Sequence, residues 1–426
     1  MKTTRRAILG AGVGLMGLTL AGCGLSGGGG SAEQDDAAKK AKEGKVEGEI
    51  SFQTWSLKNE KFTPYFEDLV ARFEKENPGV KVKWMDQPGE GYEDKLLGQA
   101  NSNALPDVVN VPPNFAYSLA KNGMLLDLAK ADDELKDVYV DGGVKAYEMP
   151  GIDGSYGYPW YLGTDMSWWN MEELGKFGVT EDSLPQNFDE LYELAMEASK
   201  QGGAAPIISS LPEIIVTSDD DGKFNFNTDE NVEFLQKYVD LYKAKAMPVE
   251  VLSDNYTGNA QLYKQEKVLW TTATSSFPTE LKTDNPGLLE KTVVTKRMGE
   301  PPLFVQGIAV SSKSKAPAAA LAFAKFATNT ENQIAFVKLA QGFLPGTKEA
   351  AADPSKFAEK SDIELQNKAV ELAAESMKTA VDPTNVMWTE DMKTNLGQQM
   401  ALAMRGDITA KEALDAAVKY GNDQLN

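Results

Sequence analysis

The sequence contains no histidine and only one cysteine among its 426 residues. Without histidine, the chain has no histidine-based catalytic triad, general base or metal ligand. A single cysteine forms neither an intramolecular disulfide nor a thiolate cluster for zinc. A large hydrophobic core must therefore hold the fold together, and the roughly 380 residues beyond the N-terminal segments are enough for two domains.

Basic residues are scarce relative to acidic ones. There are 43 Lys and Arg against 63 Asp and Glu, which gives a net charge of −20. This balance excludes nucleic acid and anionic lipid surfaces as main partners, because both are bound through clustered positive charge. The chain also lacks a glycine-rich phosphate loop followed by Lys-Ser or Lys-Thr, so we expect no nucleotide site and no cofactor.

Long apolar runs are absent as well. The apolar stretch over residues 7–22 is too short for a comfortable bilayer span, which needs roughly 20 residues. Basic residues precede it and small residues follow it, as in an export signal. Leu20-Ala21-Gly22-Cys23 resembles the lipobox of bacterial lipoproteins, in which the cysteine is acylated and becomes the new N-terminus. We therefore expect a signal peptide over 1–22 and a lipid anchor on Cys23.

The residues before the apolar stretch leave the export route open. Residues 4–9, "TRRAIL", resemble a twin-arginine export signal, although Ile8 stands where phenylalanine is usual. Ordinary secretion signals also carry paired arginines, so the general route remains an alternative. In either case the predicted location is the outer face of the cytoplasmic membrane.

Glycine, serine and charged residues dominate the next segment. Residues 23–47 contain little to bury, which predicts a flexible linker between the lipid and the folded part. Order is expected from Glu49, because Ile50, Phe52 and Thr54 then alternate as in a strand.

Helical and strand periodicities alternate after that point. A helix is expected over 62–76, a strand over 80–84, and a continuous apolar strand over 107–111. Strand character returns over 303–310, and the last third of the chain is helical. Strands that alternate with helices are typical of the α/β class with a sheet covered on both faces.

Several of these segments, in this order, resemble the family 1 extracellular solute-binding proteins, the carbohydrate-capturing lipoproteins of ATP-driven (ABC) importers. The resemblance covers essentially the whole chain, and it is carried by "FTPYFEDLVARFEKENPGVKVKW", "LPDVVNV", "NGMLLDLAK", "GSYGYPWYLGTDMSWWNMEEL", "QLYKQEKVLW" and "GIAVSSKSKAPAAALAFAKFATNTENQIAFVKLAQGFLPGT".

The resemblance implies an α/β, two-lobed, periplasmic-binding-protein-like fold of type II, whose lobes are joined by crossing hinge strands. It assigns 46–158 plus 308–345 to the N-terminal lobe and 159–306 plus 346–426 to the C-terminal lobe. The ligand is then expected between the lobes, where the carboxyl ends of strands meet.

A sugar presents CH faces that pack on aromatic rings and hydroxyl groups that need polar partners. The ends of two predicted strands supply this mixture, and we expect them to bind ligand through Trp55, Lys58, Asn59, Asn110 and Asn114. Asp107, by contrast, is expected to brace a strand end.

The resemblance adds further candidates on the crossing strands and in the second lobe. These are Tyr161, Gly163, Thr164, Ser275, Ser276, Gln306, Gly307, Phe343 and Trp388. It also places Tyr158 and Trp160 toward the hinge and cleft, whereas Trp168 and Trp169 are expected in the core of the second lobe.

The implied function is capture of a sugar, an oligosaccharide in particular, by closure of two lobes and delivery to an ABC transporter permease. A monomer without metal, nucleic acid or catalytic activity is expected. The alternative from another class is a surface lipoprotein that cleaves glycans with two carboxylates. Glu60 and Asp165 are the acidic residues nearest the aromatic strand ends, but they lie in different segments.

Overall fold

The structure, a computed structural model, describes residues 29–201, 205–219, 221–253, 256–358, 360–382 and 385–425. The expected signal peptide over 1–22 and the lipidation site at Cys23 lie outside these residues. Within the described part, no helix combines the length and apolar character needed to cross a bilayer.

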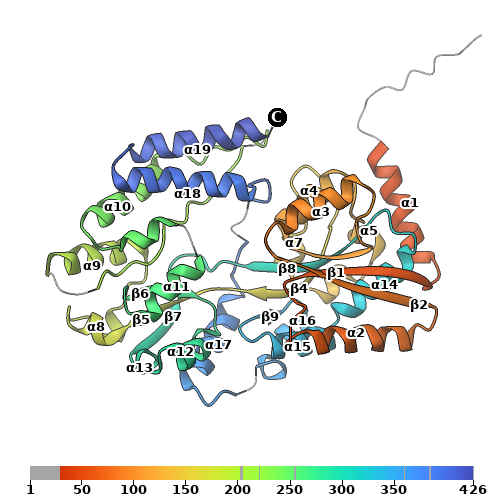
Figure 1. The fold of residues 1–426 in the computed structure, drawn as a ribbon, viewed down its shortest axis with the longest axis horizontal. Coiled ribbons are helices and arrows are strands. Elements are labelled where there is room, and N and C mark those ends of the chain that lie inside the picture. The colour runs from red at the N-terminus through yellow and green to blue at the C-terminus, as the bar shows by residue number, and fades with distance from the viewer. Residues whose placement is uncertain are drawn as a thin grey trace, which may run out of the picture.

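A six-stranded sheet forms the centre of one half of the molecule (Figure 1). Its spatial order is β2-β1-β3-β8-β4-β9. β1 pairs in parallel with β2 and β3, whereas β8 is antiparallel to β3 and β4, and β4 is antiparallel to β9. The strands are β1 (Gly48–Trp55), β2 (Val80–Gln87), β3 (Val108–Val111), β4 (Tyr158–Gly163), β8 (Phe304–Val310) and β9 (Leu344–Pro345).

Helices cover both faces of this sheet, as expected for continuous apolar strands. Val108 of β3 packs in one apolar cluster with residues of α2, α14 and α15, while the next residue, Val109, packs in a second cluster with residues of α3 and α4. Neighbouring strand side chains point to opposite faces, so each face needs its own core. The helices are α2 (Thr63–Glu76), α3 (Tyr92–Asn101), α4 (Pro113–Lys121), α14 (Pro317–Ala327) and α15 (Thr330–Leu339).

The start of β3 is braced by a half-buried network around Asp107, as the sequence predicted. Its carboxylate accepts hydrogen bonds from the Ser51 amide at 2.8 Å, the Ser51 hydroxyl at 2.7 Å and the Ser314 hydroxyl at 2.6 Å. These bonds connect β1, β3 and the segment before α14.

A three-stranded sheet of order β6-β5-β7 forms the other half. Its strands are β5 (Met166–Asn170), β6 (Trp270–Ala273) and β7 (Thr292–Lys296). Trp168 and Trp169 of β5 are fully buried, which confirms their expected place in the core. The helices of this half are α8 (Met171–Gly175), α9 (Phe188–Gln201), α10 (Asp229–Lys243), α11 (Tyr256–Lys264), α12 (Phe277–Asp284), α13 (Pro286–Leu289), α17 (Glu364–Ser376), α18 (Glu390–Arg405) and α19 (Ala410–Gln424).

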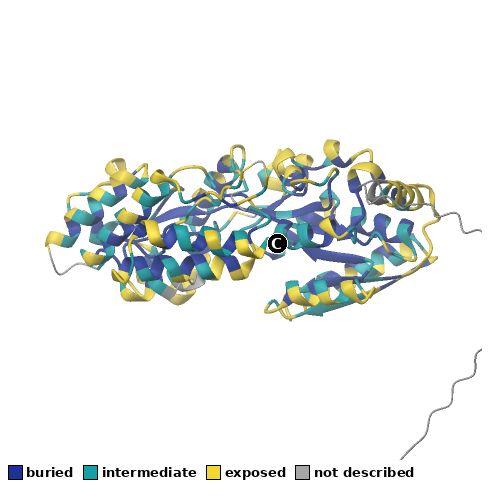
Figure 2. Cartoon of the chain, turned by 90° about the horizontal axis from the view of Figure 1, so that it is seen from above, coloured by how far each residue is buried: buried dark blue, intermediate teal, exposed yellow. Residues whose placement is uncertain are grey.

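The chain passes between the two halves at three places. β4 leads directly into β5, β7 leads back to β8, and the chain passes over again between α16 (Lys348–Ala351) and α17. The segment after α17 then runs beside Leu303, whose amide donates to the Val381 carbonyl at 2.7 Å. Seen from above, the halves lie end to end in an elongated molecule (Figure 2). The prediction of the α/β class is confirmed.

Short helices complete the half that contains the six-stranded sheet. They are α5 (Leu128–Ala131), α6 (Leu135–Val138), α7 (Asp141–Lys145) and α16 (Lys348–Ala351). Among the described residues, 3-10 turns lie over Glu181–Ser183 and Val249–Ser253 in the other half and over Pro354–Lys356 after α16.

One prediction about local order is wrong. A flexible linker was expected over 23–47, but Gly29–Glu43 forms helix α1, which lies along α5 and α14 (Figure 1). Ala38 and Ala41 are each only 4% exposed, so this helix is packed against the half that contains the six-stranded sheet. The segment is so rich in charged residues that its pattern does not reveal the three residues that make the contact, Gln34, Ala38 and Ala41.

Candidate functional site

The carboxyl end of β1 presents an aromatic pair. The Trp55 ring stacks on the Tyr92 ring, with 5.8 Å between ring centroids and 25° between their planes. A Cβ atom at Gly89 would lie 3.1 Å from the Trp55 ring, so glycine at this position lets the chain pass close to the indole. Tyr92 was not among the predicted site residues, because a tyrosine at the start of a helix carries no distinctive pattern.

Asn110, at the carboxyl end of β3, connects this pair to β8. Its side chain is 1% exposed, and Nδ2 donates to the Gly307 carbonyl at 3.1 Å and to Oε1 of Gln306 at 3.3 Å. The Tyr92 hydroxyl donates to the Asn110 carbonyl oxygen at 3.1 Å. Four predicted residues, Trp55, Asn110, Gln306 and Gly307, therefore belong to one connected group.

Two atoms of this group have unused hydrogen-bonding capacity. Nε1 of Trp55 and Oδ1 of Asn110 are buried and have no hydrogen-bond partner within the described chain. Buried polar groups are almost always paired in folded proteins, so such atoms point to a missing ligand group or to water. One is a donor and the other an acceptor, and a sugar hydroxyl can serve both kinds.

Gly307 owes its identity to close packing. A Cβ atom there would lie 2.3 Å from the hydroxyl oxygen of Tyr147, which donates to the Val111 carbonyl at 2.6 Å. No larger residue fits unless Tyr147 moves. The structure thus assigns Gly307 to the support of β8, and Tyr147 is a second residue that sequence patterns missed.

The loop after β1 holds two more predicted residues. Asn59 uses its side chain within the loop, since Oδ1 accepts from the Lys61 and Phe62 amides at 3.0 and 3.1 Å. Lys58 is exposed, and its ammonium lies 5.3 Å from the Trp84 ring centroid. Asn59 is thus a turn residue, while the Lys58 head group remains at the surface.

A separate aromatic group surrounds β4. The Tyr161 ring lies 4.9 Å from the Phe343 ring and 5.1 Å from the Phe336 ring, measured between centroids. Burial raises the pKa of the Tyr161 hydroxyl above its ordinary value. A Cβ atom at Gly163 would lie 3.5 Å from the Phe343 ring, so three predicted residues meet here.

Ser275 and Ser276 reach this group from the other sheet. The Ser275 hydroxyl donates to the Gly342 carbonyl at 3.3 Å, and Ser276 packs against the same glycine. The segment after β6 therefore contacts the segment before β9, directly beside Phe343. This contact joins the two halves of the molecule.

The remaining residues of the crossing strand are buried. Thr164 is 1% exposed, and its hydroxyl has no hydrogen-bond partner in the described chain. Tyr158 is fully buried and donates to Asp132 at 2.9 Å, so the prediction that it faces the cleft is wrong. Trp160 is likewise core, with its ring 4.4 Å from that of Phe336 between centroids.

A cavity of about 290 Å³ lies between α3 and α4 on one side and the start of α18 and end of α19 on the other. Two predicted residues, Asn114 and Trp388, line it from opposite halves of the molecule. The other lining residues are Glu93, Leu97, Tyr117, Ser118, Lys121, Asn122, Val386, Met387, Thr389, Met392, Gln424 and Leu425.

Trp388 is held firmly at this cavity. It is 8% exposed, and the rings of Phe224 and Phe226 meet it edge-on at centroid distances of 4.8 and 5.2 Å. A Cβ atom at Gly421 would lie 2.5 Å from the indole, so α19 approaches Trp388 closely only because glycine is there. Trp388 is therefore both a core residue and a wall of the cavity.

Glu93 gives the cavity its electrostatic character. Partial burial is the main cause that raises the pKa of Glu93 to about 7. The nearby carboxylates of Glu390, Asp94 and Asp391 raise it further, whereas a hydrogen bond with Ser118 lowers it. Glu93 comes from α3 and Glu390 from the start of α18, so carboxylates from the two halves of the molecule repel each other near the cavity. No sequence pattern singled out Glu93.

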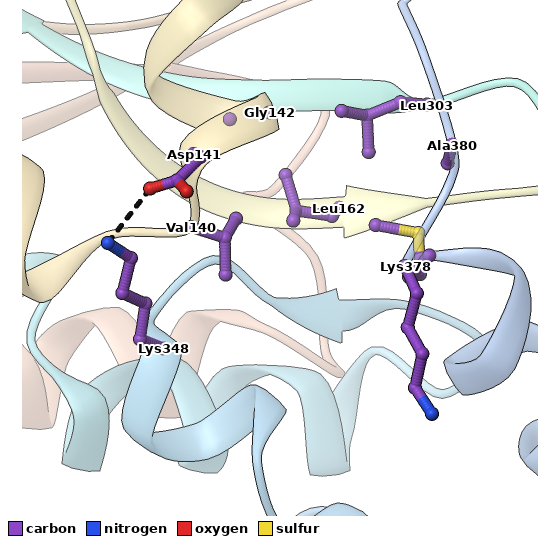
Figure 3. Close-up of a pocket in the computed structure, with 10 residues that line it drawn as sticks. Val140, Asp141, Gly142, Leu162, Leu303, Lys348, Lys378 and Ala380 are labelled. Carbon is purple, nitrogen blue, oxygen red and sulfur yellow. Dashed lines mark ion pairs between the residues drawn. The ribbon is translucent and has the colours of Figure 1, made fainter.

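A second cavity, of about 320 Å³, lies between α7, β4 and the segment after α17 (Figure 3). Apolar side chains such as Leu162 and Leu303 share its wall with Lys378 and with Lys348, which forms an ion pair with Asp141 at 2.8 Å. None of the predicted ligand residues lines this cavity. In the described residues, no group of three or more Cys, Asp or Glu side chains is arranged to hold a metal ion.

The chain is similar in sequence to curated sugar-binding proteins over part of its length. It is 25% identical over 214 residues to the arabinooligosaccharide-binding protein of Halalkalibacterium halodurans, a match that covers 46% of each chain. It is 26% identical over 203 residues to the diacetylchitobiose binding protein DasA of Streptomyces coelicolor, covering 48% of this chain and 45% of DasA. The chain spans about half the length of the curated relatives it matches.

Similarity in structure covers nearly all of the chain. A Synechococcus sp. MITs9220 protein, assigned as an oligosaccharide periplasmic-binding protein, superimposes with a TM-score of 0.76 at 25% sequence identity. The match covers 88% of this chain and 98% of that one. The two-domain, type II periplasmic-binding-protein fold expected from the sequence is thereby confirmed.

The model of the bacterial extracellular solute-binding proteins, a family of exported binding proteins, matches residues 59–334. This is well over half of the chain, and it includes every strand of the two sheets except β1, which ends at Trp55, and β9, which begins at Leu344. The chain belongs to the family of bacterial extracellular solute-binding proteins.

Proposed function

We propose that this protein captures a carbohydrate, an oligosaccharide in particular, between two lobes that close around it, and delivers it to the permease of an ABC importer. The N-terminal lobe is centred on 46–158 plus 308–345 and the C-terminal lobe on 159–306 plus 346–426, while the crossing strand β4 and helix α16 pack with the N-terminal lobe. The protein acts as a monomer and leaves the ligand chemically unchanged.

The observation that carries this proposal is the pair of unused buried polar atoms beside an aromatic face. Nε1 of Trp55 and Oδ1 of Asn110 offer a donor and an acceptor, and the Trp55–Tyr92 stack offers an apolar surface. Saccharides combine these two kinds of surface. The sugar-binding relatives in the family support the same ligand class.

The cavity that contains Trp388 supports closure between lobes. Its lining comes from α3 and α4 of the N-terminal lobe and from α18 and α19 of the C-terminal lobe. A ligand held by both lobes favours the closed population, because only that state satisfies all its polar groups.

A thermal-shift screen over a panel of oligosaccharides tests the ligand class. Arabinooligosaccharides and diacetylchitobiose belong in the panel because relatives bind them. A binding sugar at 100 times its Kd stabilises the protein by roughly 2.7 kcal/mol. Small-angle scattering should then show a smaller radius of gyration with that sugar, and chromatography should recover it intact. Binding without any change in radius would contradict closure.

We also propose that residues 1–22 are removed and that the Cys23 thiol is acylated, which anchors the protein at the outer face of the cytoplasmic membrane. Mass spectrometry of the mature N-terminus measures this directly. Cys23→Ala should leave the chain unprocessed or released, whereas an unmodified thiol on the native protein would reject the anchor.

A further inference from the structure

Helix α1 (Gly29–Glu43) is docked on the N-terminal lobe by specific polar contacts. Gln34 makes a two-point contact with the segment before α5, since its Nε2 donates to the Leu125 carbonyl at 2.8 Å and its Oε1 accepts from the Asp127 amide at 3.1 Å. An amide side chain that pairs with two backbone groups of a neighbouring segment fixes both position and rotation.

Apolar contact and close approach reinforce this docking. Ala38 and Ala41 are each 4% exposed and belong to the main core of the lobe. Together with Gln34 they recur at helical spacing on one face of α1. At the end of the helix, a Cβ atom at Gly44 would lie 3.1 Å from Cβ of Ala318 on α14, so the chain is tightly packed there as well.

The acidic residues at the start of α1 are neutralised by lysines. Glu33 pairs with Lys313 at 3.4 Å, Asp35 with Lys130 at 2.7 Å, and Asp36 with Lys40 within the helix at 2.6 Å. Near the other end, Lys42 pairs with Asp133 at 2.6 Å. Each of these four acidic side chains therefore has a basic partner, which reduces the repulsion that it would exert on anionic lipid headgroups.

The covalent distance from the proposed anchor is short. Gly29 follows Cys23 by six residues, which span at most about 20 Å when fully extended. A chain that was free from 23 to 47 would reach several times farther. The docked helix therefore shortens the tether by most of its length.

We propose that α1 is a rigid spacer that holds the N-terminal lobe close to the membrane surface in a restricted orientation, so that lobe opening moves chiefly the C-terminal lobe relative to the membrane. The inference rests on the lipid anchor of the proposed function. The partner surface is a phospholipid bilayer, and the spacer works through the Gln34, Ala38 and Ala41 contacts.

The test uses the full lipidated chain in vesicles of phosphatidylcholine and phosphatidylglycerol. Lys95→Cys on α3 and Glu233→Cys on α10 provide single labelling sites, because acylation consumes the native thiol. Both positions are exposed. Energy transfer to a headgroup acceptor then reports the distribution of distances between each label and the bilayer.

Two variants undock α1 to different extents, and one matched control leaves it docked. Ala38→Glu introduces a carboxylate into the buried face, Gln34→Ala removes only the two-point contact, and Lys39→Glu adds a carboxylate on the exposed face of the same helix. Thermal unfolding of each variant verifies that the lobes themselves remain folded.

The expected result is a narrow distance distribution for the Lys95→Cys label in the native background and with Lys39→Glu. Gln34→Ala should broaden it, and Ala38→Glu should broaden it more. Equal widths in all four backgrounds would overturn the spacer. A native chain that is not retained on vesicles would reject the anchor, and the spacer with it, whereas sugar binding by the same sample would leave the rest of the proposed function standing.

Discussion

The Tyr92 hydroxyl donates a hydrogen bond to the carbonyl oxygen of Asn110, with 3.1 Å between the two oxygen atoms. The same tyrosine stacks on Trp55, so one side chain sets the positions of two proposed sugar contacts. Burial raises the pKa of the Tyr92 hydroxyl, which therefore stays protonated as a donor at physiological pH. We expect Tyr92 to act as a positioning residue for the proposed sugar site.

Tyr92→Phe should keep the ring stack and remove only this hydrogen bond. The unpaired buried carbonyl should cost about 1–3 kcal/mol of unfolding free energy, and sugar affinity should fall because Asn110 is held less firmly. Chemical denaturation and calorimetric titration measure the two effects. Tyr242→Phe, on α10 and away from the cavity lined by Trp388, is the control and should change neither quantity. Unaltered stability and affinity in Tyr92→Phe would show that Tyr92 does not position the site.

Trp388→Ala should affect both stability and ligand binding, because Trp388 belongs to the core and to the cavity wall. Loss of its contacts with Phe224 and Phe226 should cost about 3–5 kcal/mol of unfolding free energy. Trp388→Phe retains part of this packing and should show a smaller loss of stability but a clear loss of sugar affinity. A drop in melting temperature with unaltered sugar affinity would show that Trp388 does not contact the sugar.

Gly307→Ala should destabilise the protein by about 1–3 kcal/mol, because the added methyl group overlaps the Tyr147 ring. Combining it with Tyr147→Leu should cost less than the sum of the two single changes, since the smaller side chain relieves the overlap. Thermal or chemical unfolding of the four proteins in this cycle gives the coupling energy. Additive losses of unfolding free energy would show that the methyl group added at position 307 does not overlap the Tyr147 side chain.

Glu93→Gln should change how stability depends on pH. The pKa of Glu93 is raised to about 7 in the folded chain, above its ordinary value of 4.5, so the folded state binds a proton that the unfolded state releases between these values. The stability that Glu93 contributes is fully present below its unfolded pKa and is lost as pH rises through 7.

The glutamine variant should therefore match the native protein near pH 4.5 and exceed its stability at about pH 8. The gain should be about 1 kcal/mol, once solvent screening of a partly buried group is allowed for. Denaturant titrations at both pH values measure it. Glu371→Gln, on the exposed face of α17, is the control. If both variants showed the same dependence of stability on pH, burial and the nearby Glu390 would not raise the pKa of Glu93.

The sequence by itself determined the class of the fold and much of its local order. Alternation of apolar residues located β1 and β2, a continuous apolar run located β3, and helical spacing located α2. The family resemblance placed Trp168 and Trp169 in the core of the second lobe, where both are fully buried. Asp107 was recognised as a brace, because a carboxylate beside a buried strand end needs nearby donors. These features depend on periodicity and on satisfaction of polar groups, which are visible in a short window of sequence.

Only the tertiary structure decided which of these segments meet. Tyr92 lies beside Trp55, Tyr147 packs over Gly307, and the carboxylate of Glu390 is near enough to Glu93 to raise its pKa. These pairs are far apart in the chain, and no local pattern encodes them. Helix α1 illustrates this most clearly, because its composition favours a solvated linker. In the structure, Gln34 forms hydrogen bonds with the segment before α5, and Ala38 and Ala41 are buried where α1 lies along α5 and α14. Intrinsic propensity is a weak preference, and burial against a complementary surface outweighs it.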